Sequence, residues 1–86
     1  MNKSILIVDD DIDTLQLVGT MLEQKGYEII AANNGEKALQ ITENKIPDLI
    51  ILDIMMPGID GYEVTRRLRA IEETSIVPII LFSAKS

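Results

Sequence analysis

The sequence contains no cysteine and no apolar run approaching about 18 residues, the length that a membrane-spanning helix needs. Without cysteine, neither a disulfide nor a thiolate metal site can stabilise the chain. The segment after Met1 has no apolar core of the kind found in signal peptides. These absences predict a cytoplasmic protein that has neither a membrane span nor an export signal.

Basic side chains are also scarce, because 8 lysines and arginines face 14 aspartates and glutamates, giving a formal net charge of −6. Such a charge repels the phosphates of nucleic acids and of anionic membranes, so we expect neither as a partner. The apolar fraction of 47% is ordinary for a globular protein. The length of 86 residues predicts one small domain over residues 1–86.

Short apolar runs alternate with segments of helical periodicity along the whole chain. Strands are predicted over residues 4–8, 28–32, 48–53 and 78–82, and helices over residues 12–25, 36–44 and 61–71. Asp11 and Asp60 are predicted helix N-caps, Gly26 is predicted to end the first helix, and Thr74 and Ser75 are expected in a loop. This alternation predicts an α/β domain with a parallel sheet and helices on both of its faces.

Polar side chains follow three of the four apolar runs. Asp9 and Asp10 follow the first, Asp53 ends the third, and Ser83 follows the fourth. The carboxyl ends of parallel strands meet at one edge of a sheet, where ligands bind in open α/β folds. Clustered carboxylates suit Mg²⁺, and a carboxylate can act as a nucleophile towards a phosphoryl group. Asp53 is therefore the candidate reactive residue, with Ser83 able to hydrogen-bond a phosphate oxygen.

Simpler interpretations remain open for each of these residues. The aspartates within residues 9–13 could form only a solvated acidic cap on the first helix, and Asp11 itself suits a cap better than a ligand. Asp53 could cap the loop that follows it, and Ser83 could be an ordinary residue at a strand end. The arginines within residues 66–69 are expected to form a solvated helix face rather than a partner site.

Three motifs together resemble the receiver domain of bacterial two-component response regulators. They are Ile5–Asp10 (ILIVDD), Leu52–Gly61 (LDIMMPGIDG) and Ile79–Ala84 (IILFSA). The resemblance implies a flavodoxin-like, doubly wound parallel sheet with the strand order 2-1-3-4. It also implies a phosphoacceptor that receives a phosphoryl group from a sensor histidine kinase or a phosphotransfer protein.

The same resemblance assigns roles to individual residues. It makes Asp53 the phosphoacceptor and Ser83 the hydroxyl that turns towards the phosphoryl group. Asp9 and Asp10 would bind Mg²⁺ together with Asp53 and the backbone carbonyl of Met55. The domain would not be an enzyme, because any transfer or loss of the phosphoryl group would occur on its own side chain. The competing interpretation is a receiver-like interaction or assembly module that is never phosphorylated.

One departure from the family concerns the C-terminal part of the sequence. The family has a fifth strand that ends in a lysine paired with the phosphoryl group, whereas Lys85 follows the fourth apolar run. We therefore expect a receiver domain that is incomplete at its C-terminus and lacks the fifth strand and the last helices. Residues 79–82 would then form an exposed edge strand. We expect the chain to self-associate through this strand, to exchange elements with a second copy, or to be only marginally stable.

Other phosphate-handling folds lack their required residues here. A flavodoxin that binds FMN needs a loop rich in serine, threonine or glycine after the first strand, where this chain has Asp9, Asp10 and Asp11. The glycine-rich dinucleotide and triphosphate motifs do not occur. A phosphatase of the haloacid-dehalogenase kind needs a second aspartate two residues after the nucleophile, and that position is Met55.

Overall fold

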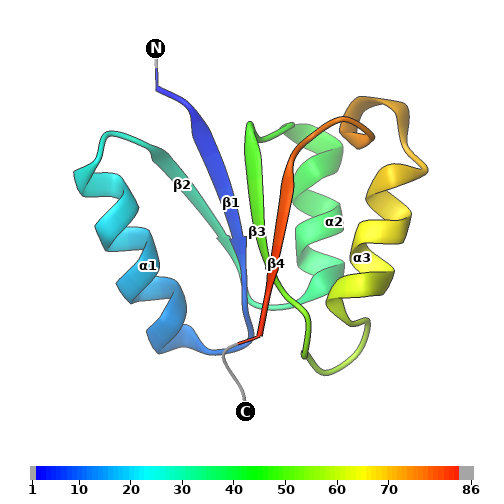
Figure 1. The fold of residues 1–86 in the computed structure, drawn as a ribbon, viewed down its shortest axis with the longest axis horizontal. Helices are drawn as coiled ribbons and strands as arrows, with labels where there is room; N and C mark the ends of the chain where they lie inside the picture. The colour runs from blue at the N-terminus through cyan, green and yellow to red at the C-terminus, as the bar shows by residue number, and fades with distance from the viewer. Residues whose placement is uncertain (1, 84–86) are drawn as a thin grey trace.

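Strands and helices alternate through residues 2–83, the part of the chain that the computed structural model describes. The strands are β1 (Ser4–Val8), β2 (Glu28–Ala32), β3 (Leu49–Asp53) and β4 (Ile79–Phe82). The helices are α1 (Ile12–Gln24), α2 (Gly35–Asn44), α3 (Gly61–Arg69) and the short 3-10 helix η1 (Glu72–Thr74). The strands form one parallel sheet in the order β2-β1-β3-β4, which confirms the predicted flavodoxin-like topology (Figure 1).

Helices cover both faces of this sheet, with α1 on one side and α2 and α3 on the other (Figure 1). The layer beneath α1 contains Ile5, Ile7, Leu15, Val18, Leu22, Ile29, Leu49 and Ile51. The opposite layer includes Leu6, Val8, Ala38, Ile50, Leu52, Val64 and Leu68. Successive strand residues point to opposite faces, so a central strand that is covered on both sides is almost continuously apolar. Every residue of β1 is buried, and only Ser4 at its start is polar. Each fully buried aliphatic side chain contributes about 1.5–3 kcal/mol.

Polar side chains set the start of each α-helix. Asp11 accepts a hydrogen bond from the Asp13 N–H at the start of α1, and Asp60 accepts one from the Glu63 N–H at the start of α3. Asn34 caps α2 in the same way. Caps of this type contribute about 1 kcal/mol each, since they satisfy a helix N–H that has no partner in the helix itself. The predicted caps Asp11 and Asp60 are confirmed.

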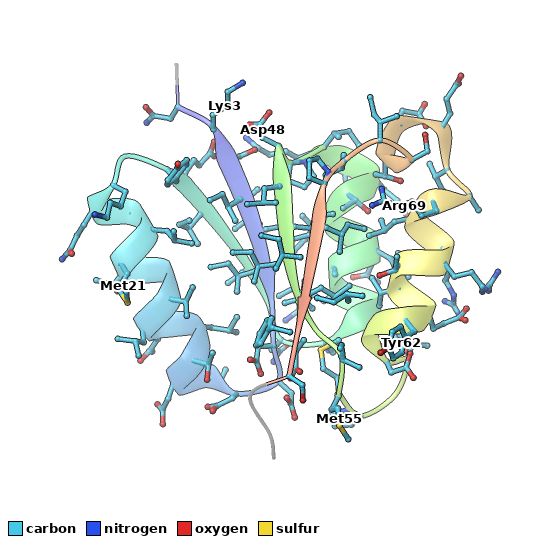
Figure 2. All side chains as sticks on the ribbon, viewed as in Figure 1. Lys3, Met21, Asp48, Met55, Tyr62 and Arg69 are labelled. Carbon is cyan, nitrogen blue, oxygen red and sulfur yellow. The ribbon has the colours of Figure 1, made fainter. Side chains whose placement is uncertain are left out.

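The segment between α3 and β4 differs from the prediction of a simple loop. Residues 72–74 form η1, in which the buried Thr74 donates its hydroxyl to the Leu68 carbonyl at 2.6 Å. The Arg69 guanidinium donates to the carbonyls of Ser75 and Val77, so this arginine is not part of a merely solvated helix face (Figure 2). These contacts between side chains and backbone leave no periodic pattern, which is why the sequence did not indicate them.

Asp48 is the second correction to the predicted elements. It was expected to begin the third strand, but β3 begins at Leu49. The Asp48 carboxylate accepts a hydrogen bond from the Ser4 N–H at 2.7 Å and so ties the starts of β1 and β3 together. This bond lowers the pKa of Asp48 below its ordinary value.

Among residues 2–83, no helix combines the length and apolarity needed to cross a bilayer.

Candidate functional site

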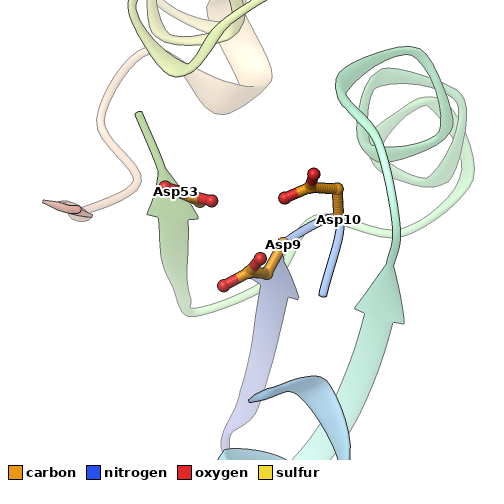
Figure 3. Close-up of side chains that lie close together, drawn as sticks. All are labelled: Asp9, Asp10 and Asp53. Carbon is orange, nitrogen blue, oxygen red and sulfur yellow. The ribbon is translucent and has the colours of Figure 1, made fainter. Parts of the chain in front are cut away.

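Three carboxylates meet at the carboxyl edge of the sheet, as the sequence predicted. Asp53 is the last residue of β3, and Asp9 and Asp10 directly follow β1 (Figure 3). Each offers an oxygen, and these oxygens all lie within 4.8 Å of one another. Val8 pairs with Leu52 in the parallel register. The residues that follow them, Asp9 and Asp53, therefore lie next to each other. We call Asp9, Asp10 and Asp53 the acid cluster.

Asp9 and Asp10 have different surroundings although they are neighbours in sequence. Asp9 is only 2% exposed, its N–H donates to the Ala32 carbonyl, and its carboxylate accepts the Asp11 N–H at 2.9 Å. Asp10 is more accessible and lines an open groove beside the cluster. Asp11 caps α1 instead of joining the cluster. The run of three aspartates therefore divides between the site and the helix cap.

Asp53 is held in place by the backbone of the loop that follows it. Its side chain is 1% exposed, and one carboxylate oxygen accepts the Met55 N–H at 3.1 Å. The Ile54 N–H donates to the Phe82 carbonyl, which continues the pairing between β3 and β4 one residue beyond Asp53. The Met55 side chain is 56% exposed and points away from the sheet at this end of the molecule (Figure 2).

Two glycines allow the loop after Asp53 to return to the sheet. Gly58 has a φ of 78°, a conformation in which a residue with a side chain is strained. Gly61 begins α3 so close to β3 that a Cβ atom would lie 2.6 Å from the Asp53 carbonyl oxygen and 2.8 Å from the Ile54 Cα. The sequence motif contained both glycines, but only the structure shows that Gly61 is required by its close approach to Asp53.

An open groove of about 650 Å³ adjoins the acid cluster on the side of this loop. It is lined by Asp10, Ile54, Met55, Met56, Pro57, Gly58, Asp60 and Tyr62. Tyr62, on the first turn of α3, is 61% exposed and was not singled out in the sequence, because an aromatic residue on a helix carries no signal of its own (Figure 2). The groove reaches the acid cluster at Asp10, whereas Asp9 and Asp53 are not among its lining residues.

Ser83 lies at the same edge of the sheet, directly after β4 and exposed. Asp53 pairs with Phe82 in the parallel register, which places Ser83 one residue beyond the level of Asp53. The strand ends thus bring the hydroxyl and the acid cluster to one edge, as expected. Lys85, which the sequence analysis distinguished from the family lysine, lies outside the described residues.

The donor chemistry of the acid cluster fits a hard divalent cation. All three donors are carboxylate oxygens, and two of the three side chains are almost completely buried. Mg²⁺ prefers oxygen ligands and commonly uses one or two carboxylates together with waters and phosphate oxygens. Buried carboxylates at this spacing repel one another strongly unless a cation or a proton compensates their charge.

The fold and this edge define a doubly wound α/β domain with an acidic site at its strand ends. The chain belongs to the response regulator receiver domain family, which it matches over residues 5–86. It is 45% identical over 85 residues to the alkaline phosphatase synthesis transcriptional regulatory protein PhoP of Bacillus subtilis, covering 99% of this chain and 35% of that protein. It is 37% identical to protein PilH of Pseudomonas aeruginosa, covering 94% of this chain and 67% of that protein.

Solved structures of response regulators have the same fold as this chain. The chemotaxis protein CheY4 of Vibrio cholerae is similar with a TM-score of 0.95 and 30% identity, over 100% of this chain and 72% of that chain. The response regulator TrrA of Thermotoga maritima, solved in complex with Mg(2+)-BeF, has a TM-score of 0.88 and 44% identity, over 98% of this chain and 71% of that chain. The chain spans about a third of the length of the curated regulator PhoP.

Proposed function

We propose that this receiver domain accepts a phosphoryl group on Asp53 from a sensor histidine kinase or a phosphotransfer protein, in a reaction that depends on Mg²⁺. The observation that carries the proposal is the acid cluster, in which a buried carboxylate at a strand end lies beside two further carboxylates. An isolated aspartate cap has no need of such neighbours, because their charges destabilise it.

The chemistry assigned to Asp53 is nucleophilic. One carboxylate oxygen attacks the phosphorus of a phosphohistidine, the P–N bond breaks as the O–P bond forms, and the partner's imidazole leaves with the bonding electrons. The product is an acyl phosphate on Asp53. The hydrogen bond from the Met55 N–H orients the Asp53 carboxylate for this attack. The groove beside Asp10 provides the approach for the donor.

Asp9 and Asp10 hold the cation in this proposal, together with Asp53 and the backbone carbonyl of Met55. Mg²⁺ held by these residues would neutralise the charge that the phosphoryl group brings to a site already lined by carboxylates. The similarity to TrrA, whose structure contains Mg(2+)-BeF, supports this assignment. Ser83 is proposed to hydrogen-bond a phosphoryl oxygen, since its strand ends next to that of Asp53.

The domain has no separate substrate in this proposal, because both formation and loss of the acyl phosphate occur on its own Asp53. It would act as the receiving component of a two-component system rather than as an enzyme. Its membership of the receiver family, over residues 5–86, supports the assignment of a histidine kinase as partner.

Acetyl phosphate, a small donor, tests the reaction without the partner. Wild type, Asp53→Asn and Glu23→Gln are incubated with acetyl phosphate and either Mg²⁺ or EDTA, and intact mass is measured. We expect wild type and Glu23→Gln to gain one phosphoryl group with Mg²⁺ only, and Asp53→Asn to gain none. Glu23 is the control, because it is an acidic residue of α1 that belongs neither to the acid cluster nor to the groove beside it. A folded wild type that gains no mass contradicts the proposal and favours an unphosphorylated interaction module.

A further inference from the structure

A pocket of about 300 Å³ lies between the end of α2 and the short helix η1. Its walls come from the segments that lead from α2 to β3 and from α3 to β4, at the end of the sheet where these two strands begin (Figure 1). The acid cluster lies at the other end, where the strands finish. The pocket is therefore separate from the site of the proposed phosphorylation.

Both walls of the pocket are held by hydrogen bonds within the protein. On the α2 side, the buried Thr42 donates its hydroxyl to the Leu39 carbonyl at 2.9 Å. On the η1 side, the buried Thr74 donates its hydroxyl to the Leu68 carbonyl, and the Arg69 guanidinium holds the segment that follows η1 through its backbone carbonyls. A pocket whose walls are already fixed can bind a partner with little ordering of the protein.

Two exposed isoleucines give this pocket an apolar surface. Ile46 and Ile71 are each 42% exposed, and both line the pocket. Neither belongs to the core layer beneath α1 or to the layer beneath α2 and α3. Covering such side chains is favourable, because it removes apolar atoms from water. The two isoleucines therefore favour a partner group that has an apolar part.

Two glutamates make the same pocket acidic. Glu43 in the last turn of α2 and Glu73 in η1 both line it, and none of its lining residues is basic. Within residues 2–83, neither glutamate forms a salt bridge, and Lys45 is engaged by Glu28 at 3.1 Å. The last turn of α2 contains no basic residue, so Glu43 lies at the negative end of the helix dipole without compensation. A cation bound in the pocket would supply the missing positive charge.

The size and the charge of the pocket together limit what it can bind. Its volume lies at the lower end of the range of about 300–1,000 Å³ found for ligand sites, so it suits one long side chain better than a large ligand. Lysine and arginine combine an apolar stem with a charged head. Arginine fits two carboxylates better, because its guanidinium carries several N–H donors in a fixed plane. Nucleic acids and anionic lipids would be repelled by the glutamates.

We propose that this pocket docks an arginine side chain from a basic segment of a partner protein. The arginine stem packs against Ile46 and Ile71, and its guanidinium donates hydrogen bonds to the carboxylates of Glu43 and Glu73. The partner therefore binds at the end of the sheet opposite Asp53. This contact does not use the acid cluster, so its failure leaves the proposed function unaffected.

A short capped peptide, Ala-Leu-Arg-Leu-Ala, tests the pocket beside the same peptide with citrulline in place of arginine. Citrulline keeps the shape of arginine but carries no charge. Each peptide is titrated into isotope-labelled wild type with excess Mg²⁺, which competes for the acid cluster, and amide chemical shifts are measured. We expect the arginine peptide to shift the amides of residues 42–46 and 71–74, and the citrulline peptide to bind at least about tenfold more weakly. Equal binding of the two peptides, or shifts confined to the acid cluster, overturns the proposal.

Single variants test the charged part of the pocket. Glu43→Gln and Glu73→Gln should each bind the arginine peptide at least about threefold more weakly than wild type, and the affinity of wild type should fall as salt is added. Glu23→Gln is the matched control, because it removes one negative charge from α1, outside the pocket, and should bind like wild type. Folded Glu43→Gln and Glu73→Gln proteins that both bind as tightly as this control overturn the proposal.

Agmatine, which has the arginine side chain without a peptide backbone, separates a protein partner from a small cation. We expect agmatine to bind more weakly than the peptide, because it lacks the neighbouring residues that would contact the rim of the pocket. If agmatine binds as tightly as the peptide, the assignment to a partner protein is wrong and the pocket is a site for a small cation.

Discussion

The acid cluster and the Glu63 carboxylate of α3 stand in opposite electrostatic settings. Glu63 accepts hydrogen bonds from Arg66 and Arg67, which lower its pKa from 4.5 to about 2. The acid cluster instead brings three carboxylates together, with oxygens within 4.8 Å of one another. Charges of opposite sign support the helix in the first case, whereas charges of the same sign oppose the fold in the second.

The two sites also differ in how strongly water screens their charges. The Glu63 side chain is 31% exposed, and surface ion pairs of this kind contribute little to stability because water screens them. Asp9 and Asp53 are almost fully buried, so their repulsion is screened much less. The acid cluster is therefore the region where we expect the removal of a carboxylate to act most strongly.

The largest effect is expected on metal binding by the acid cluster. Asp9→Asn should weaken Mg²⁺ binding by about a hundredfold, because even groups that only orient metal ligands account for 10–100-fold in affinity. Titration calorimetry measures this change, and Glu63→Gln is the control that removes a carboxylate outside the cluster. Equal Mg²⁺ affinities for Asp9→Asn and wild type would contradict the assignment of Asp9 as a ligand.

The next effect concerns the close approach of α3 to the end of β3. Gly61→Ala should lower the free energy of unfolding by about 2 kcal/mol, because its Cβ would collide with backbone atoms of Asp53 and Ile54. Gly19→Ala in α1 is the matched control, since its Cβ would make an ordinary 3.5 Å contact with Ile29. That control should gain up to about 1 kcal/mol from helix propensity, and denaturant unfolding measures both. A stabilised Gly61→Ala would show that the loop moves aside freely.

A smaller stabilisation should follow when one charge of the acid cluster is removed. Without metal, Asp53→Asn should raise the free energy of unfolding by about 1 kcal/mol or more, since it relieves repulsion while its amide oxygen can still accept the Met55 N–H. Thermal unfolding in EDTA measures this, and added Mg²⁺ should reduce the gain by stabilising wild type more. If Asp53→Asn is less stable than wild type in EDTA, the negative charge of the acid cluster is already compensated by other groups of the protein.

The smallest effect is expected at Glu63 and depends on pH. Its pKa in the folded domain is depressed to about 2, below the ordinary value of 4.5. The stability that it contributes is therefore present above pH 4.5 and is lost as the pH falls towards 2. Urea unfolding across this range should show a stability difference between wild type and Glu63→Gln that shrinks on acidification. Glu23→Gln in α1 controls for the loss of one negative charge.

Most of the fold could be predicted from local patterns. Unbroken apolar runs indicated the buried strands, and the alternation with helical segments indicated the order that the structure confirms. The caps Asp11 and Asp60 were predictable because capping depends on residues only two or three positions apart. The meeting of Asp9 and Asp53 was also predictable, since parallel strands end at one edge.

What escaped prediction depends on contacts between segments distant in sequence. The η1 turn exists because Thr74 and Arg69 bond to backbone carbonyls around it, and no periodicity records such bonds. Asp48 belongs to the link with Ser4 rather than to β3 for the same reason. Tyr62 lines the groove only because α3 returns beside the strand ends.

The sequence by itself determined the alternating elements, the parallel sheet and the identity of the carboxylates at its edge, because apolar spacing and capping act over short distances. Only the tertiary structure decided how close those carboxylates come and why Gly61 cannot carry a side chain beside Asp53. These properties arise when strands and helices from distant parts of the chain are packed against one another, and packing distances are not encoded in any local pattern.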